Sequence, residues 1–254
     1  MPASSIWHRL ISGFKDPAPV NTAMCFWEVD VHSHLVPGVD DGVKDPEQAL
    51  ACLNQLVEWG IRKVITTPHI SGDWYPNKPA DLRQGLIDLQ ILIDQHQLPL
   101  SIELAAEYLI DDFFFDLLQK EELLSFGPRK YLLIETGWAW APAQIDDILF
   151  RIQTHGYTPV LAHPERYKYY HENRKGLLHL REIGCLFQLN WMSLIGRYGV
   201  ESQKQARFLV NQRVIDFIGS DLHQPKDLKD MARLLYSNEL QLLQNQPLLN
   251  NTLF

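Results

Sequence analysis

Seven strand-like segments alternate with helix-like segments along the chain, and this alternation limits the possible folds more than any other feature. The predicted strands are short runs rich in Val, Ile and Leu, at 27–31, 63–67, 100–105, 131–134, 158–162, 185–189 and 214–218. The segments that follow them have a helical period, at 46–59, 80–96, 111–120, 142–155, 169–183, 201–211 and 228–243. Alternation at this spacing favours parallel strands joined by right-handed crossovers. Short apolar strands that are buried on both faces fit an open sheet as well as a barrel.

Residues that can bind a metal, or that are otherwise polar, follow every predicted strand. In chain order they are His32, His34, Asp41, His69, Glu107, Glu135, His163, Asn190, Asp221 and His223. An open doubly wound sheet collects its ligands at one crevice, whereas a barrel turns all of its strand ends toward a common centre. The sequence therefore predicts an α/β, TIM-barrel-like fold with its active site at the carboxyl ends of the strands.

Each of these residues taken alone has an ordinary structural explanation. A lone histidine such as His69 is more often a hydrogen-bonding loop residue, and a lone carboxylate is more often a helix cap or a solvated charge. Their gathering at one end of seven successive strands favours a shared site instead. The other five histidines fall on predicted helices or their ends and are expected to be surface or packing residues: His8, His96, His155, His171 and His179.

The donor types indicate which metals such a site would hold. Imidazole and carboxylate ligands without a thiolate suit Zn, Mn or Fe. His32 and His34 are two residues apart at a strand end, so both can point to one side and hold one ion. Nine ligands are too many for a single ion, and with one bridging carboxylate they suit two or three. Clusters of that kind prepare a metal-bound hydroxide and stabilise an oxyanion, as in phosphatases.

Composition excludes several other classes of protein. The chain of 254 residues has a formal net charge of −8, which argues against nucleic acid as its partner. Three scattered cysteines are too few for a disulfide scaffold, and a reducing, cytoplasmic location is expected. The chain is expected to carry neither a secretory signal nor a transmembrane segment, since 1–20 has no apolar core and no window approaches 18 apolar residues.

The domain organisation is expected to be simple. Residues 1–25 form an N-terminal extension, and residues 26–254 form a single (β/α) barrel domain. Apolar residues of the extension recur at helical spacing between 6 and 14, which indicates a short amphipathic helix that docks on the protein's own surface rather than on a membrane or a partner.

Several of the polar residues lie in longer motifs that follow one another in a fixed order from Asp30 to His223. The motifs are Asp-Val-His-Ser-His-Leu-Val-Pro-Gly-Val-Asp-Asp-Gly at 30–42, Thr-Thr-Pro-His at 66–69, Ala-Glu-Tyr at 106–108, Ile-Glu at 134–135, Ala-His-Pro-Glu-Arg-Tyr at 162–167 and Gly-Ser-Asp-Leu-His at 219–223. Together they resemble the bacterial metal-dependent tyrosine phosphatases of the CpsB/YwqE type, which belong to the polymerase-and-histidinol-phosphatase (PHP) superfamily.

This resemblance implies a distorted seven-stranded (β/α)7 PHP barrel with three divalent ions, Mn being expected and Fe or Zn being alternatives. One ion would be held by His32, His34, Glu107 and Asp221. Glu107 would bridge to a second ion, completed by Glu135 and His163. Asp41, His69 and His223 would hold the third.

The resemblance also assigns phosphate binding. Arg166 matches the family's phosphate-contacting arginine and is the expected catalytic residue. Some members carry a further arginine shortly after the last motif, where this chain reads Gln-Pro-Lys-Asp-Leu-Lys at 224–229. Lys226 or Lys229 could substitute there, although a lysine lacks the bidentate fork of an arginine.

The activity implied by the resemblance is hydrolysis of phosphotyrosine on a protein by attack of a metal-bound hydroxide. The implied substrate is a membrane-associated bacterial tyrosine kinase that controls capsule or exopolysaccharide export. No cysteine lies in the Cys-x5-Arg loop of ordinary tyrosine phosphatases. Aromatic residues after the strand ends could receive a tyrosyl ring or pack the loops: Trp74, Tyr75, Trp138, Trp140, Tyr167 and Trp191.

Three alternatives stay open at this point. A PHP phosphatase for a small phosphomonoester, such as histidinol phosphate, would share the same metal ligands. An amidohydrolase-type deaminase also begins with His-x-His, but that class usually needs an eighth strand ending in Asp, and only seven strands are predicted. A non-catalytic regulator is disfavoured because all nine ligand positions are intact. Oligomeric state is not indicated by the sequence.

Overall fold

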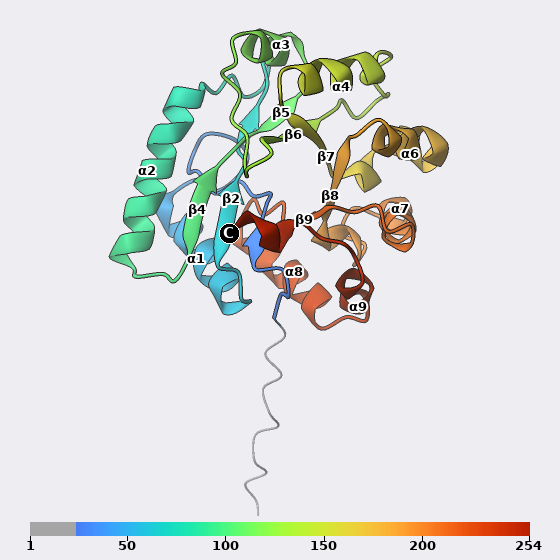
Figure 1. Cartoon of the computed structure of the whole chain (residues 1–254). Coiled ribbons are helices and arrows are strands. Elements are labelled where there is room, and N and C mark those ends of the chain that lie inside the picture. Colours follow the sequence, from blue (N-terminus) through green and yellow to red (C-terminus); the bar gives the residue numbers. More distant parts are fainter. Residues whose placement is uncertain (1–23) are drawn as a thin grey trace, which may run out of the picture.

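The computed structural model describes residues 24–254. All strand pairs in this part of the chain are parallel. One sheet has the order β1-β2-β4, and the other has the order β3-β5-β6-β7-β8-β9. The strands are β1 (Val29–Asp30), β2 (Lys63–Thr66), β3 (His69–Ile70), β4 (Ser101–Leu104), β5 (Glu107–Leu109), β6 (Tyr131–Glu135), β7 (Thr158–Ala162), β8 (Leu186–Asn190) and β9 (Phe217–Gly219). Figure 1 shows them curling about a common centre with helices on the outside.

The strands number nine rather than seven because a short strand that was not predicted follows the second and the third predicted strands. The predicted strand at 63–67 corresponds to β2, and β3 begins after Thr67 and Pro68, since a proline has no N–H with which to continue a ladder. The predicted strand at 100–105 corresponds to β4, and β5 begins after two alanines. Both chain segments run from the first sheet into the second, so the two sheets are continuous through them.

The first and last strands also approach one another. Ser33 and Leu222, which follow β1 and β9, form an isolated parallel bridge. The His34 N–H donates to the Leu222 carbonyl at 2.9 Å, and the Asp221 N–H donates to the His32 carbonyl at 2.8 Å. The sheet is therefore curled far enough for its two ends to hydrogen-bond directly beyond the strands.

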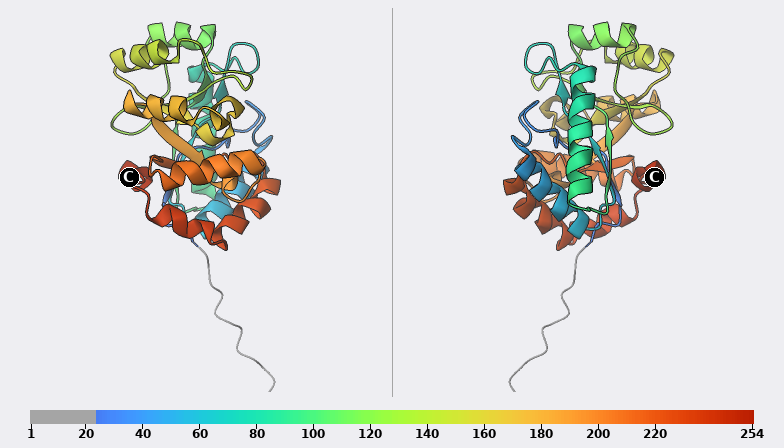
Figure 2. Two further views of the ribbon diagram at one scale, coloured as in Figure 1. Left: turned by 90° about the vertical axis from the view of Figure 1, so that its right-hand side faces the viewer. Right: turned by 90° about the vertical axis from the view of Figure 1, so that its left-hand side faces the viewer.

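The helices follow the predicted order with local differences. They are α1 (Pro46–Glu58), α2 (Pro79–Gln95), α3 (Asp112–Gln119), α4 (Ile145–Thr154), α5 (Lys168–His171), α6 (Arg174–Glu182), α7 (Val200–Asn211), α8 (Leu228–Leu235) and α9 (Glu239–Gln244). Asp45 caps α1, as predicted, by accepting a hydrogen bond from the Gln48 N–H. Figure 2 shows α2 lying along one outer side of the molecule.

Two helices that were predicted as continuous are interrupted, and the fourth starts late. The segment 169–183 is divided because the Asn173 side chain accepts from the Gly176 N–H and so begins a new helix. The segment 228–243 is divided near Ser237, whose hydroxyl donates to the Leu234 carbonyl. The helix predicted from 142 begins at Ile145 instead. Within residues 24–254, none of the helices combines the length and apolar character that crossing a bilayer requires.

The inner surface of the curled sheet changes from apolar to polar along the strands. Tyr131 and Leu133 of β6 and Leu186 of β8 belong to one small inner cluster, whereas the residues between them pack outward in the larger core. Because side chains of a strand alternate between its faces, Glu135 shares the inner face of β6 with Tyr131 and Leu133. Gln188 and Asn190 likewise share the inner face of β8. The carboxyl ends of the strands are thus the polar end of the interior.

The 3-10 helix η5 (Asn250–Leu253) joins β1 to β9 from a distant part of the chain. The Asn250 side chain is buried, accepts from the Ile218 N–H at 3.0 Å, and donates to the carbonyls of Val29 and Ile218 at 2.8 and 2.7 Å. Leu253 packs in the inner cluster.

Replacing Asn250 by Ala is expected to destabilise the fold by about 2–4 kcal/mol, since three buried backbone groups lose their only side-chain partner. Urea unfolding would measure the change. The matched control is Asn251→Ala, because the Asn251 side chain also bonds two backbone groups, Glu28 N and Phe26 O, but in an exposed setting. Equal effects of the two substitutions would contradict the importance of burial here.

Candidate metal centre

The nine side chains predicted as metal ligands lie together at the carboxyl ends of the strands. They form four overlapping groups of at least three residues whose donor atoms lie within 4.8 Å of one another. The groups are His32, His34 and Asp221; His32, Glu107 and His163; His69, Glu107 and Glu135; and His34, Asp41, His69 and His223. Seven of the nine residues line a cavity of about 860 Å³. His32 and His34 lie beneath it and are fully buried.

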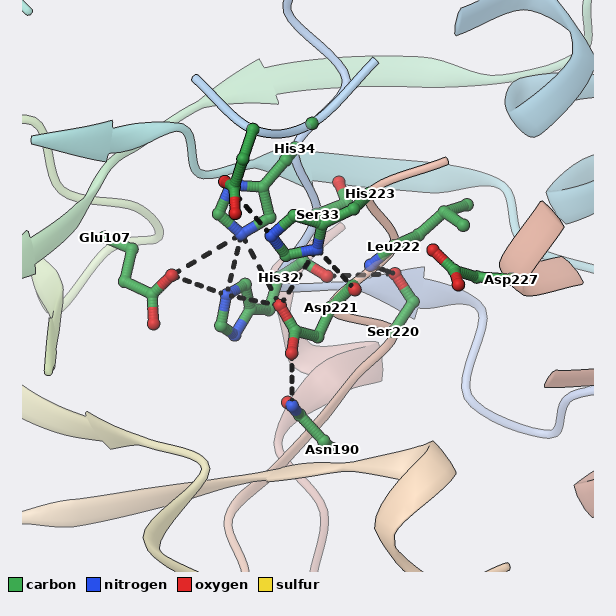
Figure 3. Close-up of polar contacts among 12 residues, drawn as sticks. His32, Ser33, His34, Glu107, Asn190, Ser220, Asp221, Leu222, His223 and Asp227 are labelled. Atoms are coloured by element: carbon green, nitrogen blue, oxygen red, sulfur yellow. Dashed lines mark hydrogen bonds and ion pairs between the residues drawn. The ribbon is translucent and has the colours of Figure 1, made fainter. Parts of the chain in front are cut away.

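His32 and His34 face two carboxylates at the centre of the cluster (Figure 3). Their Nε2 atoms are 3.3 Å apart, and Glu107 Oε2 lies 3.0 Å from the first and 3.4 Å from the second. Asp221 Oδ1 is 3.5 Å from both nitrogens. Two imidazole nitrogens and two carboxylates converge here, and this buried donor set is suited to a divalent ion.

The histidines and carboxylates of the centre shift one another's pKa values. Burial alone would lower the pKa of His34, but Asp40, Asp221 and Glu107 raise it well above its usual value. Burial alone would raise the pKa of Glu107, but the neighbouring histidines hold it well below its ordinary value. Asp221 behaves in the same way. The carboxylates therefore stay ionised inside the protein, which is the form that binds metal.

Glu107 has the central position, because each of its oxygens meets different imidazoles. Oε1 is 2.8 Å from His163 Nε2, whereas Oε2 faces His32 and His34 and lies 3.3 Å from His69 Nδ1. His69 Nδ1 is also 3.3 Å from Glu135 Oε1. Such an arrangement allows Glu107 to bridge two ions.

A further group lies nearer to solvent. Asp41 Oδ1 is 3.6 Å from His69 Nε2 and 3.5 Å from His223 Nε2. The rings of His34 and His223 stack with their centroids 4.0 Å apart. This geometry groups His34 with these three, and Glu135 with His69, more closely than the resemblance implied. The division of the ligands among individual ions stays a prediction.

Asp40 and Gln188 orient the histidines, and the sequence reasoning missed both. Asp40 Oδ2 bonds His34 Nδ1 at 2.9 Å and accepts from the His69 N–H at 3.0 Å. Gln188 Oε1 lies 2.8 Å from His32 Nδ1. These contacts leave the two Nε2 atoms directed at the centre, and such partners raise the basicity of ligating histidines. Asp40 stands beside Asp41 in the first motif, and this pair of acidic residues was the sequence feature that could have indicated Asp40.

Gly219 allows the close approach of β9 to β1. A Cβ atom at this position would lie 2.5 Å from the His32 Cβ and 2.6 Å from Gln188 Nε2. Both neighbours belong to the metal centre or support it. A side chain here would therefore displace His32 directly.

Gly219→Ala is expected to destabilise the protein by about 1–3 kcal/mol and to weaken metal binding. Thermal unfolding and metal analysis of the dialysed protein would measure both effects. Gly137→Ala serves as the control, because a Cβ at Gly137 would meet nothing within 4 Å. Equal stability and equal metal content of the two variants would show that the metal centre does not depend on close packing at Gly219.

Arg166 lies beside the cluster, as predicted, and follows β7 in the 3-10 helix η2 (Pro164–Arg166). Its Nη1 donates to Asp221 Oδ2 at 2.9 Å. Lys226 lines the same cavity, whereas Lys229 is not among the lining residues of the described chain.

Arg197 also lines the cavity, and sequence reasoning missed it. It pairs with Asp227 at 3.2 Å and with Asp230 at 3.6 Å. The one sequence feature that could have placed Arg197 at the cavity is its position in the segment that follows β8.

The six aromatic residues named from the sequence divide into three groups. Trp74, Tyr75 and Trp138 line the cavity. Tyr167 and Trp191 are fully buried and pack in the core. Trp140 is 76% exposed and is not among the residues that line the cavity. The packing explanation is therefore correct for Tyr167 and Trp191.

The other histidines within residues 24–254, and the cysteines, are absent from the four groups and from the cavity lining. His179 is exposed and pairs with Asp146, and His171 contacts the Glu165 carbonyl, which agrees with surface and packing roles. His8 and the amphipathic pattern at 6–14 lie outside the described residues. The three cysteines are free and buried, and burial raises the pKa of Cys52 and Cys185 to about 12.

A curled parallel sheet with helices outside it, whose strand ends gather histidines and carboxylates over a cavity, defines an α/β protein with a candidate metal centre. The family model for capsular polysaccharide synthesis, CpsB/CapC, matches residues 28–235, and the chain belongs to this family.

Curated relatives and a solved structure agree with this assignment. The tyrosine-protein phosphatase YwqE of Bacillus subtilis (strain 168) is 34% identical over 198 residues, 78% of each chain. The tyrosine-protein phosphatase CpsB of Streptococcus pneumoniae is 28% identical over 200 residues, 77% of this chain and 82% of that protein. Crystal structures exist for YwqE from Bacillus subtilis and CpsB from Streptococcus pneumoniae, and the two proteins are described there as unique metal-dependent tyrosine phosphatases. The matched chain superposes with a TM-score of 0.75 at 31% identity, covering 86% of this chain and 95% of that one.

Proposed function

We propose that this protein is a metal-dependent protein-tyrosine phosphatase. The observation that carries the proposal is the convergence of nine imidazole and carboxylate side chains on one cavity, with the Arg166 guanidinium bound to Asp221 at its edge. The relatives named above as tyrosine phosphatases, which match over most of the chain, support the same reaction.

The proposed architecture is a single distorted seven-stranded PHP barrel that occupies 26–254 and follows an N-terminal extension at 1–25. The seven chain segments of parallel strand and the bridge between Ser33 and Leu222 support it.

The proposed ligands are His32, His34, Asp41, His69, Glu107, Glu135, His163, Asp221 and His223. Divalent ions bound there, proposed to be three Mn²⁺ ions, would acidify water and neutralise phosphate charge. Four of the ligands are acidic, so three divalent ions against four negative charges would leave a net charge of about +2. An acidic protein can in this way present a cationic pocket to a phosphate dianion.

The protein's own side chains would bind and orient the substrate. Arg166 has guanidinium N–H groups beside the centre that suit phosphate oxygens, and Lys226 and Arg197 add positive charge to the cavity wall. Trp74, Tyr75 and Trp138 supply flat surfaces for a tyrosyl ring. A tyrosinate leaving group has a pKa near 10, so its departure depends less on a proton donor than that of an alkoxide.

The proposed substrate is a phosphotyrosine protein, namely a membrane-associated bacterial tyrosine kinase of capsule or exopolysaccharide regulation. The family's description as capsular polysaccharide synthesis proteins supports this assignment. A cytoplasmic location is proposed with it, supported by the free state of the three cysteines.

Comparing a phosphotyrosyl peptide with histidinol phosphate tests the proposal. We expect kcat/KM to favour the peptide by at least about 100-fold, because the cavity is wide and walled by aromatic rings. Hydrolysis of histidinol phosphate without hydrolysis of the peptide would replace the proposal by a PHP phosphatase for small phosphomonoesters. Hydrolysis of neither would favour a non-catalytic protein.

A further inference from the structure

The Arg166 guanidinium lies over two aromatic rings that come from different loops. Its Cζ atom is 4.7 Å from the centre of the Trp138 ring and 4.3 Å from the centre of the Tyr198 ring. Trp138 follows β6, Arg166 follows β7, and Tyr198 precedes α7. Three consecutive strand-to-helix connections thus meet at this one side chain.

One edge of the same guanidinium is also fixed. Arg166 Nη1, Asn190 Nδ2 and the Tyr198 hydroxyl all donate to Asp221 Oδ2, at 2.9, 2.5 and 3.2 Å, and Figure 3 shows the contact between Asn190 and Asp221. Asp221 Oδ1 remains directed at His32 and His34. Within residues 24–254, the bond to Asp221 is the one hydrogen bond that the guanidinium makes, so its other N–H groups are available to a ligand in the cavity.

We propose that Trp138 and Tyr198 form an aromatic clamp that holds Arg166 in its phosphate-binding orientation. They are positioning residues that act through Arg166. An arginine that contacts two rings and is bonded along one edge has little rotamer freedom left to lose when it binds an anion, so pre-orientation increases affinity. The inference rests on the proposed phosphatase function and deepens it.

Trp138 and Trp140 provide a matched comparison within one loop. Trp138 is 49% exposed, and besides Arg166 it stacks on His163, with ring centres 5.6 Å apart and an interplanar angle of 17°. Trp140, two residues further on, makes no ring contact with another aromatic residue or cation among the described residues. Trp140→Leu therefore removes an equal aromatic area without touching Arg166.

The experiment measures the affinity of Mn²⁺-loaded protein for inorganic phosphate by calorimetry, together with KM and kcat for a phosphotyrosyl peptide. We expect Trp138→Leu and Tyr198→Leu to weaken phosphate binding about 3- to 10-fold and to raise KM similarly. Trp140→Leu should stay within about twofold of wild type, and Tyr198→Phe, which keeps the ring, should lose less than Tyr198→Leu. Metal content should be unchanged in Trp138→Leu.

A double-mutant cycle distinguishes a clamp from a direct contact with phosphate. In an Arg166→Met background, Trp138→Leu should cause no further loss of phosphate affinity, because the clamp has nothing left to orient. A full additional loss would overturn the clamp and make Trp138 a direct ligand. Loss of metal from Trp138→Leu would also overturn it, since the role would then be structural.

The remaining outcomes separate the clamp from the function on which it rests. Wild-type protein that binds phosphate and hydrolyses phosphotyrosine, with Trp138→Leu indistinguishable from Trp140→Leu, would overturn the clamp alone. Wild-type protein that binds no phosphate and hydrolyses no phosphomonoester would overturn both.

Discussion

Thorough chelation of divalent ions should reduce hydrolysis of a phosphotyrosyl peptide by roughly three orders of magnitude or more. The reason is that none of the described cavity-lining residues is a cysteine that could attack phosphate as in ordinary tyrosine phosphatases. The cysteine thiols are buried, and their pKa values are raised by that burial. The imidazoles and carboxylates that converge on the cavity can bind metal ions. Without those ions they have no means of activating water for attack on phosphate.

Adding Mn²⁺ to the chelated protein should restore activity, and it should raise the unfolding temperature, because an ion that binds only the folded state stabilises it. The control is the same chelator saturated with Mn²⁺ before addition, which should leave activity intact. Unimpaired hydrolysis after metal analysis finds no bound ion would defeat the metal-dependent mechanism. Restoration by Zn²⁺ or Fe²⁺ but not by Mn²⁺ would correct the proposed metal alone.

The positions of the ligands could be predicted from the sequence because parallel strands place their carboxyl ends together. His163 follows β7 directly, and Glu135 and Asn190 end β6 and β8, so simple strand prediction brings them to one edge. His69 and Glu107 instead begin the short strands β3 and β5. The structure still brings both into the cluster, because β3 and β5 follow the second and third predicted strands closely and pair with His69 opposite Glu107.

The residues that hold the ligands in place could not be predicted in the same way. Asp40 contacts His34 and the His69 backbone through a turn whose shape depends on Gly42, where a Cβ would lie 2.3 Å from the His34 carbonyl oxygen. Arg197 and Tyr198 lie in a connection that follows β8 at a distance. Their relation to Arg166 depends on how three loops pack, and loop packing has no periodic signal in sequence.

Helix boundaries differed from prediction for a related reason. The helical spacing of apolar residues does not distinguish one long helix from two shorter consecutive helices. Between α5 and α6 the Asn173 side chain caps a second start, and near Ser237 a hydroxyl binds the carbonyl of the preceding turn. Both are local side-chain contacts with the backbone, and they outweigh the periodicity because each satisfies polar groups at a helix end.

Glu107→Gln should reduce activity by roughly three orders of magnitude or more and remove at least one bound ion per chain. Glu107 is fully buried, and its two oxygens meet four imidazoles, His32, His34, His69 and His163. Glutamine has nearly the same shape, so the cavity stays filled. Its amide lacks the negative charge, however, and it turns N–H donors toward nitrogens that would have to bind metal. Of the four acidic residues among the proposed ligands, Glu107 meets the most imidazoles.

Glu103→Gln is the matched control for this substitution. Glu103 lies on β4, the strand that leads into β5 and Glu107, but its carboxylate pairs with Lys63 at 2.8 Å in a partly exposed position. We expect the control to retain full metal content and activity within about twofold, since partly exposed ion pairs contribute little. Circular dichroism should be the same for both variants and wild type. A Glu107→Gln protein that kept its metal and lost less than about tenfold in activity would exclude Glu107 as a bridging ligand, and the donors would then have to serve separate ions.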